Sequence, residues 1–487
     1  MSSVRDTPGS RLRGLQGRPW AVLAVASAAF FLAQLDALVV TVAVPQIQDG
    51  LGATLGQAVW ALTGYLLALA VALITGGRLG DLFGHRRVFL AGLAVFTLAS
   101  AACGAAQTPG QLIAARVLQG LGAALFTPQT MAMLVAHFPA ERRGTAFGVR
   151  GAAGGIAAVT APVLGGLLVG ALDWRWVFLV NVPVGAATLL LARLALPAAP
   201  PAPAGREGGP RPGRLDLPGV VLAAAALLCL SFAAGQGGTY GWNGRLWALL
   251  AAGGALSVGF LAQQRARQLR SPLVPFGLFA DRGFSRMTAC AVVVAATVTG
   301  LVLLLSVYFQ SVAGYGALLA GLVLVPASAC SAVLNPLAGR LSGRVEGRLL
   351  VLGGIGATAA GMLWAAALMR PGAAWPEFLL PLCLIGAGNA FLLTPLVTTA
   401  LREVPARLSG AASGVLGTAL QVGAMAGAAT VGPLVQAAQT AQSAPSAGAL
   451  RPAMVLLASV ASVGGLALLA SRTTPRVPIR TGHLERG

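Results

Sequence analysis

The sequence predicts an all-α polytopic membrane protein, with two six-helix bundles in parallel repeat and two inserted helices. Three observations lead to this prediction. The composition is 56% hydrophobic and only 9% charged, long apolar runs recur along the chain, and motifs of the first half return in the second. A soluble globular domain carries roughly 25% charged residues, so water is excluded as the main solvent of this chain.

Apolar runs long enough to cross a bilayer follow one another between short breaks that contain Gly, Pro or Arg. A membrane helix needs about 20 consecutive apolar residues, and fourteen such runs can be laid along the chain. The even number places both tails on one side of the membrane. The predicted helices cover residues 20–44, 56–76, 88–107, 110–135, 145–171, 175–196, 217–236, 246–264, 287–311, 318–338, 349–369, 377–400, 410–436 and 452–471.

The arginines lie mainly on one side of this predicted topology. The net charge is +20, and all 33 basic residues are arginine. Most fall in the tails and in loops on the side of the tails, with Arg150 counted in the loop group near Arg142. The positive-inside rule places that side in the cytoplasm, so we expect a multi-pass protein of the plasma or inner membrane with both termini cytoplasmic. The arginines assigned to the other side are Arg175, Arg245, Arg370 and Arg451.

The predicted spans divide the chain into two bundles with an insertion between them. A stretch rich in Pro and Gly from Leu196 to Arg214 has the composition of a linker. The predicted units are a cytoplasmic amino tail at 1–19, an amino-terminal six-helix bundle at 20–196, a linker with two inserted transmembrane helices at 197–286, a carboxy-terminal six-helix bundle at 287–471 and a cytoplasmic carboxyl tail at 472–487.

Three short motifs recur in the two predicted bundles at a nearly constant separation. The segment 139–149 is similar to 405–415, Gly77-R-L-G is similar to Gly339-R-L-S, and a Thr-Pro pair occurs at Thr127 and again at Thr394. Chance similarity explains any one of these matches more easily than all three. A parallel repeat places the substrate site between the two halves, near the midplane of the bilayer.

Asp36 and Arg116 are the two charged residues that this assignment places deep inside a span. An ionisable residue within the hydrocarbon costs about 2.5–3.5 kcal/mol or more, so its default interpretation is functional. Both residues lie at a similar depth near the outer ends of their helices, which lets them pair. One interpretation is a structural ion pair. The other is that Asp36 carries protons, because desolvation favours a neutral carboxyl group and a nearby guanidinium favours the ionised one.

Around these two residues the chain resembles the major facilitator superfamily, and specifically its fourteen-helix drug:proton antiporter branch. The segment L-D-A-L-V-V-T-V-A-V-P at 35–45 is similar to the helix 1 signature L-D-x-T-[IV]-V-N-V-A-L-P, with Leu38 and Thr41 in place of Thr and Asn. Arg116-V-L-Q-G resembles the helix 4 motif R-x-x-Q-G. The resemblance implies that Asp36 and Arg116 take part in proton coupling.

Two further motifs of the same family imply moving parts. The segment 77–87, G-R-L-G-D-L-F-G-H-R-R, resembles the loop motif G-x-x-x-D-x-x-G-R-R, with His85 in place of an Arg. The resemblance implies a conformational switch loop at Gly77, Asp81, Gly84, Arg86 and Arg87, although ordinary topology-setting charge also explains the two arginines. In the fifth predicted helix, A-A-V-T-A-P-V-L-G-G resembles the antiporter signature G-x-x-x-G-P-x-x-G-G. It implies a hinge at Pro162, Gly165 and Gly166, with Ala157 and Ala161 replacing Gly.

The resemblance extends over almost the whole chain. Its most specific match is W-R-W-V-F-L-V-N-V-P-V-G at 174–185, and a further match lies at 409–421, where Gly417 and Leu420 stand at positions that commonly hold Asn and Arg. Several uncharged polar residues are candidates for lining a substrate cavity, and each fits interhelical contact equally well. They are Gln34, Tyr65, Gln119, Gln310, Asn389 and Gln421.

These observations favour a proton-coupled exporter of small, largely hydrophobic drugs or antibiotics over five alternatives. A symporter or facilitator for uptake is the nearest of them, because the antiporter signature is only partly kept, and a membrane sensor normally adds a soluble signalling domain. An enzyme is disfavoured, since the three histidines form no catalytic or metal-binding pattern. A nucleotide-driven pump is excluded, because the P-loop that it needs cannot occur without lysine. Arginines divided among loops do not fit a nucleic-acid partner.

The expected partners follow from this function. They are a small-molecule substrate, protons and the lipid bilayer, with no nucleic acid. We expect a monomer that uses the proton gradient as its energy source and needs no cofactor and no metal. The five cysteines lie in apolar runs, where they fit small core side chains.

Overall fold

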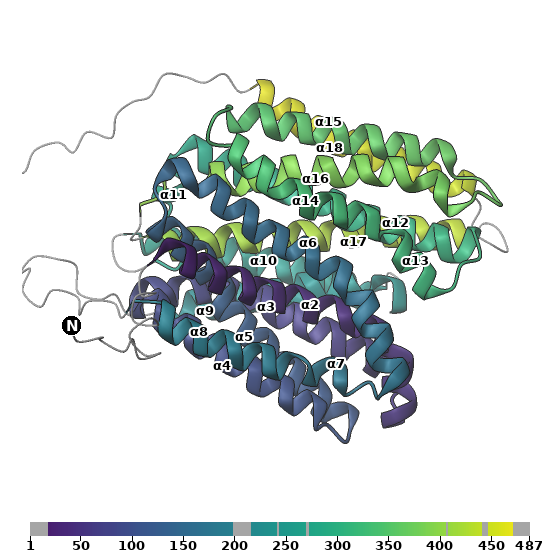
Figure 1. Ribbon diagram of the computed structural model, residues 1–487, viewed down its shortest axis with the longest axis horizontal. Helices are drawn as coiled ribbons and strands as arrows, with labels where there is room; N and C mark the ends of the chain where they lie inside the picture. The colour runs from purple at the N-terminus through teal and green to yellow at the C-terminus, as the bar shows by residue number, and fades with distance from the viewer. Residues whose placement is uncertain are drawn as a thin grey trace, which may run out of the picture.

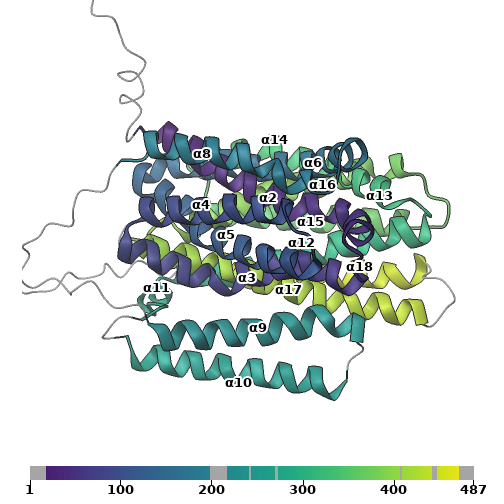
Figure 2. The ribbon, with the colours of Figure 1, turned by 90° about the horizontal axis from the view of Figure 1, so that it is seen from below.

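The protein is a bundle of long helices whose axes share one general direction (Figures 1 and 2). The computed structural model describes residues 18–197, 216–240, 243–268, 272–405, 408–440 and 447–470. The predicted tails, apart from residues 18 and 19, and nearly all of the Pro- and Gly-rich linker lie outside the described residues. In Figure 1 the first half of the chain forms one layer and the second half lies beside it.

Short caps and turns separate the helices of the first half. Thr54 and Thr108 each accept a hydrogen bond from the backbone of the helix that follows, and Gly84 permits a tight turn through its φ of 92°. The helices are α2 (Pro19–Leu51), α3 (Leu55–Phe83), α4 (His85–Gly104), α5 (Pro109–His137), α6 (Ala140–Ala171), α7 (Trp176–Leu179) and α8 (Asn181–Ala195).

The second half repeats this pattern after an inserted pair of helices. The inserted pair is α9 (Leu217–Tyr240) and α10 (Gly244–Ala266), followed by the short α11 (Gly277–Ala280). The later elements are α12 (Arg282–Val307), η1 (Tyr308–Val312), α13 (Ala317–Val323), α14 (Val325–Leu341), α15 (Gly347–Leu368), η2 (Trp375–Phe378), α16 (Leu379–Ala400), α17 (Ser409–Thr440) and α18 (Ala447–Ala470).

Eleven helices of the described chain are long and apolar enough to cross a membrane. Two shorter apolar segments, Leu217–Ala233 in α9 and Leu450–Gly464 in α18, lie beside them in the bundle. The remaining long helix, α5, has 29 residues and carries Arg116 and several glutamines. It packs against α3 and α4, and the side chains of Arg116, Gln119 and Gln129 lie inside the bundle. The structure therefore describes a multi-pass arrangement of helices.

The inserted pair lies on one flank of the bundle, with α10 on the outside (Figure 2). The α9 helix contacts both α3 and α17 and so touches both halves. Asp216, directly before α9, fixes the pair at one end: its carboxylate accepts hydrogen bonds from Gln263 and Gln264, and it pairs with Arg267 at 2.9 Å. The inserted helices are thus attached to a seam between the two halves.

Glycines form the two closest contacts between the halves. Gly77 in α3 packs against Gly410 in α17, and Gly339 in α14 packs against Gly144 in α6. In each pair, a Cβ on either glycine would overlap the carbonyl oxygen of its partner. Gly77 and Gly339 occupy matching positions in the repeated motifs, as do Gly144 and Gly410. The two seams are therefore equivalent positions of the repeat, and small residues allow the helices to approach there.

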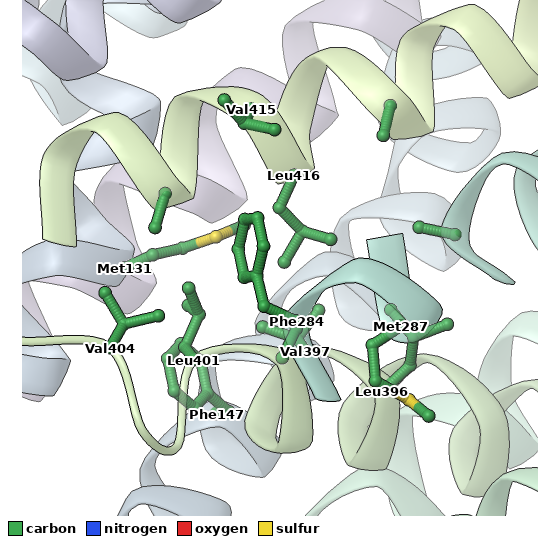
Figure 3. Close-up of a cluster of buried hydrophobic side chains, with 14 of the residues drawn as sticks. Met131, Phe147, Phe284, Met287, Leu396, Val397, Leu401, Val404, Val415 and Leu416 are labelled. Atoms are coloured by element: carbon green, nitrogen blue, oxygen red, sulfur yellow. The ribbon is translucent and has the colours of Figure 1, made fainter. Parts of the chain in front are cut away.

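A cluster of buried apolar side chains joins the halves at one end of the bundle. We call this end the arginine-rich end, because Arg86, Arg142 and Arg402 lie at its turns. This closing cluster brings Met131 and Phe147 of the first half against residues of the second half (Figure 3). The second-half members labelled in Figure 3 are Phe284, Met287, Leu396, Val397, Leu401, Val404, Val415 and Leu416.

The other buried clusters of the described residues do not cross between the halves. Two of them, around Val177 and Phe126, belong to the first half, and one, around Phe309, belongs to the second. The clusters around Val177 and Phe309 lie toward the end opposite the arginine-rich end. The halves are thus fastened by apolar packing at the arginine-rich end and keep separate cores toward the opposite end.

We expect Gly339→Ala to lower the free energy of unfolding by about 1–3 kcal/mol, the usual cost of overpacking. The added methyl group would meet the backbone of α6 at Gly144. The matched control is Gly353→Ala in α15, where a Cβ meets nothing within 4 Å. Equilibrium unfolding of the purified protein in mixed micelles measures the difference. Equal stability of the two variants would show that the seam tolerates a side chain.

Candidate functional site

Asp36 lies at the centre of a fully buried polar network. Its Oδ2 atom is 2.6 Å from a terminal nitrogen of Arg116, and its Oδ1 atom accepts hydrogen bonds from Gln119 at 2.8 Å and from Asn181 at 2.7 Å. All four side chains have zero exposure. They come from α2, α5 and α8, so the structure brings together the two residues that the sequence singled out. Their proton-coupling role stays a prediction.

Ser100 in α4 completes the network from a fourth helix. Its hydroxyl accepts hydrogen bonds from the amides of Gln119 and Asn181 and donates one to the Phe178 carbonyl at 2.9 Å. Each of the two amides therefore divides its donors between Asp36 and Ser100. This sharing ties α4 and α8 to the carboxylate, so a change at Asp36 reaches several helices.

Arg116 is held on its other sides by the backbone of α3 and by aromatic rings. Its Nε donates to the Ala61 carbonyl at 2.9 Å, and its central carbon lies 4.3 Å from the centroid of the Tyr65 ring. One terminal nitrogen of Arg116 has no hydrogen-bond partner. An aromatic face attracts a guanidinium, so Tyr65, expected in a substrate cavity, serves here to position Arg116.

The hydrogen bonds around Asp36 determine what binding of a proton there would require. As built, both oxygens of Asp36 accept only from donor groups, so the network is complete when the carboxylate is ionised. A proton on either oxygen displaces one of these donors. Because the exposure of Asp36 is zero, a proton reaches it only after α2, α5 or α8 moves. Protonation of Asp36 would therefore require movement of at least one of these helices.

Asn181 and Ser100 are the site residues that sequence reasoning missed. Asn181 lies inside the segment 174–185, whose similarity to the family was strong without assigning a role to any one residue. Ser100 has no distinguishing sequence context, because serine is common in apolar helices. For Asn181 the available signal was an amide in the middle of a specific motif.

Asp81 of the switch loop binds the start of α17 across the seam. Its two carboxylate oxygens accept hydrogen bonds from the backbone nitrogens of Gly410 and Ala411, each at 2.8 Å. A negative charge at a helix N-terminus is favourable. His85 lies beside this contact, with one ring nitrogen 2.8 Å from Gln129 and the other 3.3 Å from Ser409. Asp81 thus fastens the first half to the second at the arginine-rich end.

The other residues of the switch loop lie at the end of α8, at the surface or in a turn. Arg86 donates to the carbonyls of Leu196 and Arg193, where α8 ends. Arg87 is exposed, and Gly84 makes the turn between α3 and α4. Of the five residues, Asp81 and Gly77 are the ones that contact the opposite half.

The expected hinge motif packs α6 against α2. Ala157 and Ala161 are fully buried, and a Cβ at Gly165 would lie 3.1 Å from the side chain of Val39. Pro162 and Gly166 are partly buried in the same helix. The motif therefore packs against the part of α2 that comes after Asp36 in the sequence. The alanines keep this contact close, as glycines would. The hinge itself stays a prediction.

The six residues that were expected to line one substrate cavity lie at different places in the structure. Gln119 and Tyr65 belong to the Asp36 network. Gln34 is half-buried, Gln310 is exposed and donates to Ser306, and Asn389 is partly buried with an unpaired side-chain oxygen. The sixth, Gln421, lines a cavity of about 330 Å³.

This cavity lies where α9 covers the seam between α3 and α17. Its walls are mainly apolar, and Trp60 and Phe232 face each other there with ring centroids 5.6 Å apart. Ligand pockets commonly measure about 300–1,000 Å³ and are lined by apolar groups with a few polar ones. The polar lining residues are Thr63, Ser231, Thr299 and Gln421.

Arg150 corrects the sequence assignment, which counted it with the loop near Arg142. It lies inside α6 and is 5% exposed, and its Nε donates to Thr130 at 2.9 Å. The assignment failed because the apolar run was taken to begin near residue 145, and the arginine five residues later was grouped with the preceding positive charges. The described part of the chain therefore holds a second buried guanidinium besides Arg116.

Comparison with known proteins identifies the family. Residues 26–428 match the family model described as Major Facilitator Superfamily. The chain belongs to this superfamily. An uncharacterized MFS-type transporter of Mycobacterium tuberculosis is 38% identical, over 85% of this chain and 70% of that protein. As a member of this transporter family, the chain is a multi-pass membrane protein, and no catalytic activity is indicated for it.

Other relatives in the superfamily are named for antibiotic export and resistance. The tetracenomycin C resistance and export protein of Streptomyces glaucescens is 34% identical, over 89% of this chain and 78% of that protein. The puromycin resistance protein pur8 of Streptomyces alboniger is 38% identical, over 86% and 82% of the two chains. The human organic anion transporter MFSD10 (TETRAN) has the same fold, with a TM-score of 0.61, 15% identity and coverage of 92% and 99%.

For this superfamily member we expect Asp81→Asn to loosen the closed arginine-rich end. The variant loses the charge that binds the start of α17, and hydrogen bonds to charged groups contribute about 1.5–3 kcal/mol. Labelling of Cys290, a buried member of the closing cluster, should become about tenfold faster in a thiol-reagent assay read by mass spectrometry. The matched control is Asp173→Asn at the opposite end, whose carboxylate is 47% exposed. Unchanged labelling of Cys290 in Asp81→Asn would remove Asp81 from the closure.

Proposed function

We propose that this transporter is a proton-coupled antiporter that exports small, largely hydrophobic drugs or antibiotics by alternating access. The observation that supports it most is the buried network in which Asp36 contacts Arg116 at 2.6 Å. A membrane protein rarely keeps a charged residue in its interior unless ion or proton movement uses it. The names of the antibiotic exporters among its relatives support the substrate class.

The proposal assigns all fourteen predicted helices to the membrane and the arginine-rich end to the cytoplasm. In this assignment α5, α9 and α18 cross the bilayer beside the eleven more apolar helices. The excess of arginine at one end supports the orientation through the positive-inside rule. The working partners are the bilayer, protons and one small molecule, with no cofactor, and the chain acts as a monomer.

In the proposed cycle, the structure corresponds to the state that is closed toward the cytoplasm. The closing cluster, the two glycine seams and the Asp81 contact hold the halves together at that end. When α2, α5 or α8 moves, a proton from the outside reaches Asp36, removes its charge and releases Arg116 and the two amide donors. The helices that carry these groups then shift, and the contacts at the arginine-rich end open for substrate.

The cavity under α9 provides space for an apolar substrate beside the moving seam. It is enclosed by α3 of the first half, α12 and α17 of the second half and α9 of the insertion. The described lining residues include no charged side chain, which suits the apolar surface of a substrate better than a polycation. Helix α9 of the inserted pair thus forms one wall of this space.

The test of proton coupling is transport of a lipophilic fluorescent dye into energised everted membrane vesicles. We expect Asp36→Asn to lose at least about 90% of gradient-driven accumulation, because the variant cannot exchange a proton at this position. Asp173→Asn, an exposed carboxylate at the opposite end, is the control that should transport like the native protein. Equal gradient-dependent transport by Asp36→Asn would eliminate Asp36 from the mechanism. Accumulation in right-side-out vesicles alone would instead support an uptake symporter.

A second test addresses the cavity. We expect Phe232→Ala to raise the half-saturating dye concentration about two- to tenfold, because an aromatic contact contributes about 0.5–1.5 kcal/mol. Leu228→Ala, one turn earlier in α9 at a side chain that is 49% exposed, is the matched control. The measurement is the concentration dependence of dye accumulation. An equal change in both variants would exclude a specific role for the cavity.

A further inference from the structure

Arg150 is a buried cation to which the structure gives no counter-ion. Its side chain is 5% exposed, and one terminal nitrogen is buried without a hydrogen-bond partner. None of the ion pairs among the described residues includes it. Removing a charge from water without a partner is unfavourable, and within a membrane such a residue marks a functional site by default.

Two neutral groups hold the guanidinium in place. Its Nε donates to the Thr130 hydroxyl at 2.9 Å, and its central carbon lies 3.7 Å from the centroid of the Phe30 ring. Gly154, one turn after Arg150, makes room for this ring, since a Cβ there would lie 2.7 Å from it. These contacts orient the side chain and leave its charge uncompensated.

The other buried charges of the first half already have partners. Asp36 lies on the same helix as Phe30, but its oxygens accept from Arg116, Gln119 and Asn181. It therefore does not neutralise Arg150 in this state. Asp81, whose side chain is 2% exposed, binds the start of α17 instead, so Arg150 is the buried charge of the described first half that has no such partner.

Arg150 lies at the edge of the closing cluster, on the side away from the arginine-rich end. It is ten residues past Ala140, where α6 begins, so it lies about 15 Å along the helix. Phe147 precedes it by one turn in α6, and Met131 directly follows Thr130 in α5. A molecule that enters between the halves from the opposite end would meet Arg150 where the apolar closure begins.

We propose that Arg150 binds an anionic group of the transported molecule, a carboxylate on a largely apolar body. This inference rests on the proposed export function and makes the substrate class narrower. A guanidinium presents a planar set of donors that matches a carboxylate, and charge-assisted hydrogen bonds of this kind are strong. The carboxylate supplies the negative charge that the site lacks, and the Phe30 ring lies against the apolar body.

The experiment measures binding of anthracene carboxylate and anthracene carboxamide to the purified full-length protein in lipid nanodiscs, by fluorescence titration. The two probes have nearly the same shape and differ in charge. We expect the native protein to bind the carboxylate at least about tenfold more tightly, and Arg150→Gln to lose this preference. Affinity for the carboxamide should stay within about twofold of the native value.

Two further variants separate a specific site from general charge effects. Arg150→Lys keeps the charge without the planar fork and should retain part of the preference. Arg245→Gln removes an exposed arginine of α10 and should bind both probes like the native protein. Should Arg150→Gln fail to fold, a partial preference in Arg150→Lys together with equal binding of both probes by Arg150→Met would still support the site. A native protein that binds both probes equally, or an unchanged preference in Arg150→Gln, would overturn the proposal.

The binding assay tests the anion site and the transport assay tests the export function, so one proposal can be wrong while the other holds. If the native protein shows no gradient-driven dye transport but an Arg150-dependent carboxylate preference, the export function is wrong and the anion site remains. If dye transport depends on Asp36 while Arg150→Gln keeps the native preference, the exporter remains and the anion site is wrong. Transport of a neutral dye by Arg150→Gln should match the native rate, since the dye offers no anionic group.

Discussion

The burial of Asp36 beside Arg116 is the constraint on which the arrangement of the first half depends. Neither charge is stable in the apolar interior alone, so each must find its partners there. The carboxylate meets this requirement through α2, α5 and α8, and Ser100 of α4 joins the same donors. The contact of Arg116 with the backbone of α3 adds a fifth helix. The packing of the first half is thus organised around one pair of charges.

The contacts between the halves have a different physical character. They rely on glycines that allow close backbone approach, on an apolar cluster and on one charged contact from Asp81 to the start of α17. Such contacts can separate without leaving a buried charge unpaired. Asp81 lies at the arginine-rich end, where water can replace the backbone donors. The molecule therefore combines a tightly bonded interior in the first half with contacts between the halves that leave no buried charge unpaired when they separate, as the proposed alternating-access cycle requires.

Much of the fold could be predicted from the sequence, because a bilayer imposes a simple rule on composition and length. Every predicted span corresponds to helix in the structure, although several helices extend further than expected, such as α3 to Phe83 and α6 back to Ala140. Apolar runs mark the part of a helix that is surrounded by lipid or by the apolar core of the protein. They do not mark polar ends that continue the helix through backbone hydrogen bonds alone. Arg150 was misassigned for a different reason, because it lies within the predicted span 145–171 but was counted with the positive charges directly before that span.

Residues of the site could be predicted from the sequence only where their type is rare in apolar helices. A carboxylate and a guanidinium at similar depth in apolar helices predicted the Asp36–Arg116 contact. Amides and hydroxyls are common in such helices, so Asn181 and Ser100 could not be distinguished from packing residues. The candidates Gln310 and Gln421 show the same limit, because their positions depend on helix rotation and on the place of the inserted pair. Both properties arise from packing between distant parts of the chain.

The composition of α5 also bears on how the protein is made. Insertion of a helix from the ribosome into the bilayer depends on its own hydrophobicity, and an arginine within the apolar segment opposes that step. Although α5 is 29 residues long, it does not reach the apolar threshold that eleven other helices meet. Its entry is favoured once α2 offers Asp36 as a partner and α3 and α4 shelter its glutamines. Because α2, α3 and α4 are synthesised before α5, the groups that bind its polar side chains are already in place when α5 enters the membrane.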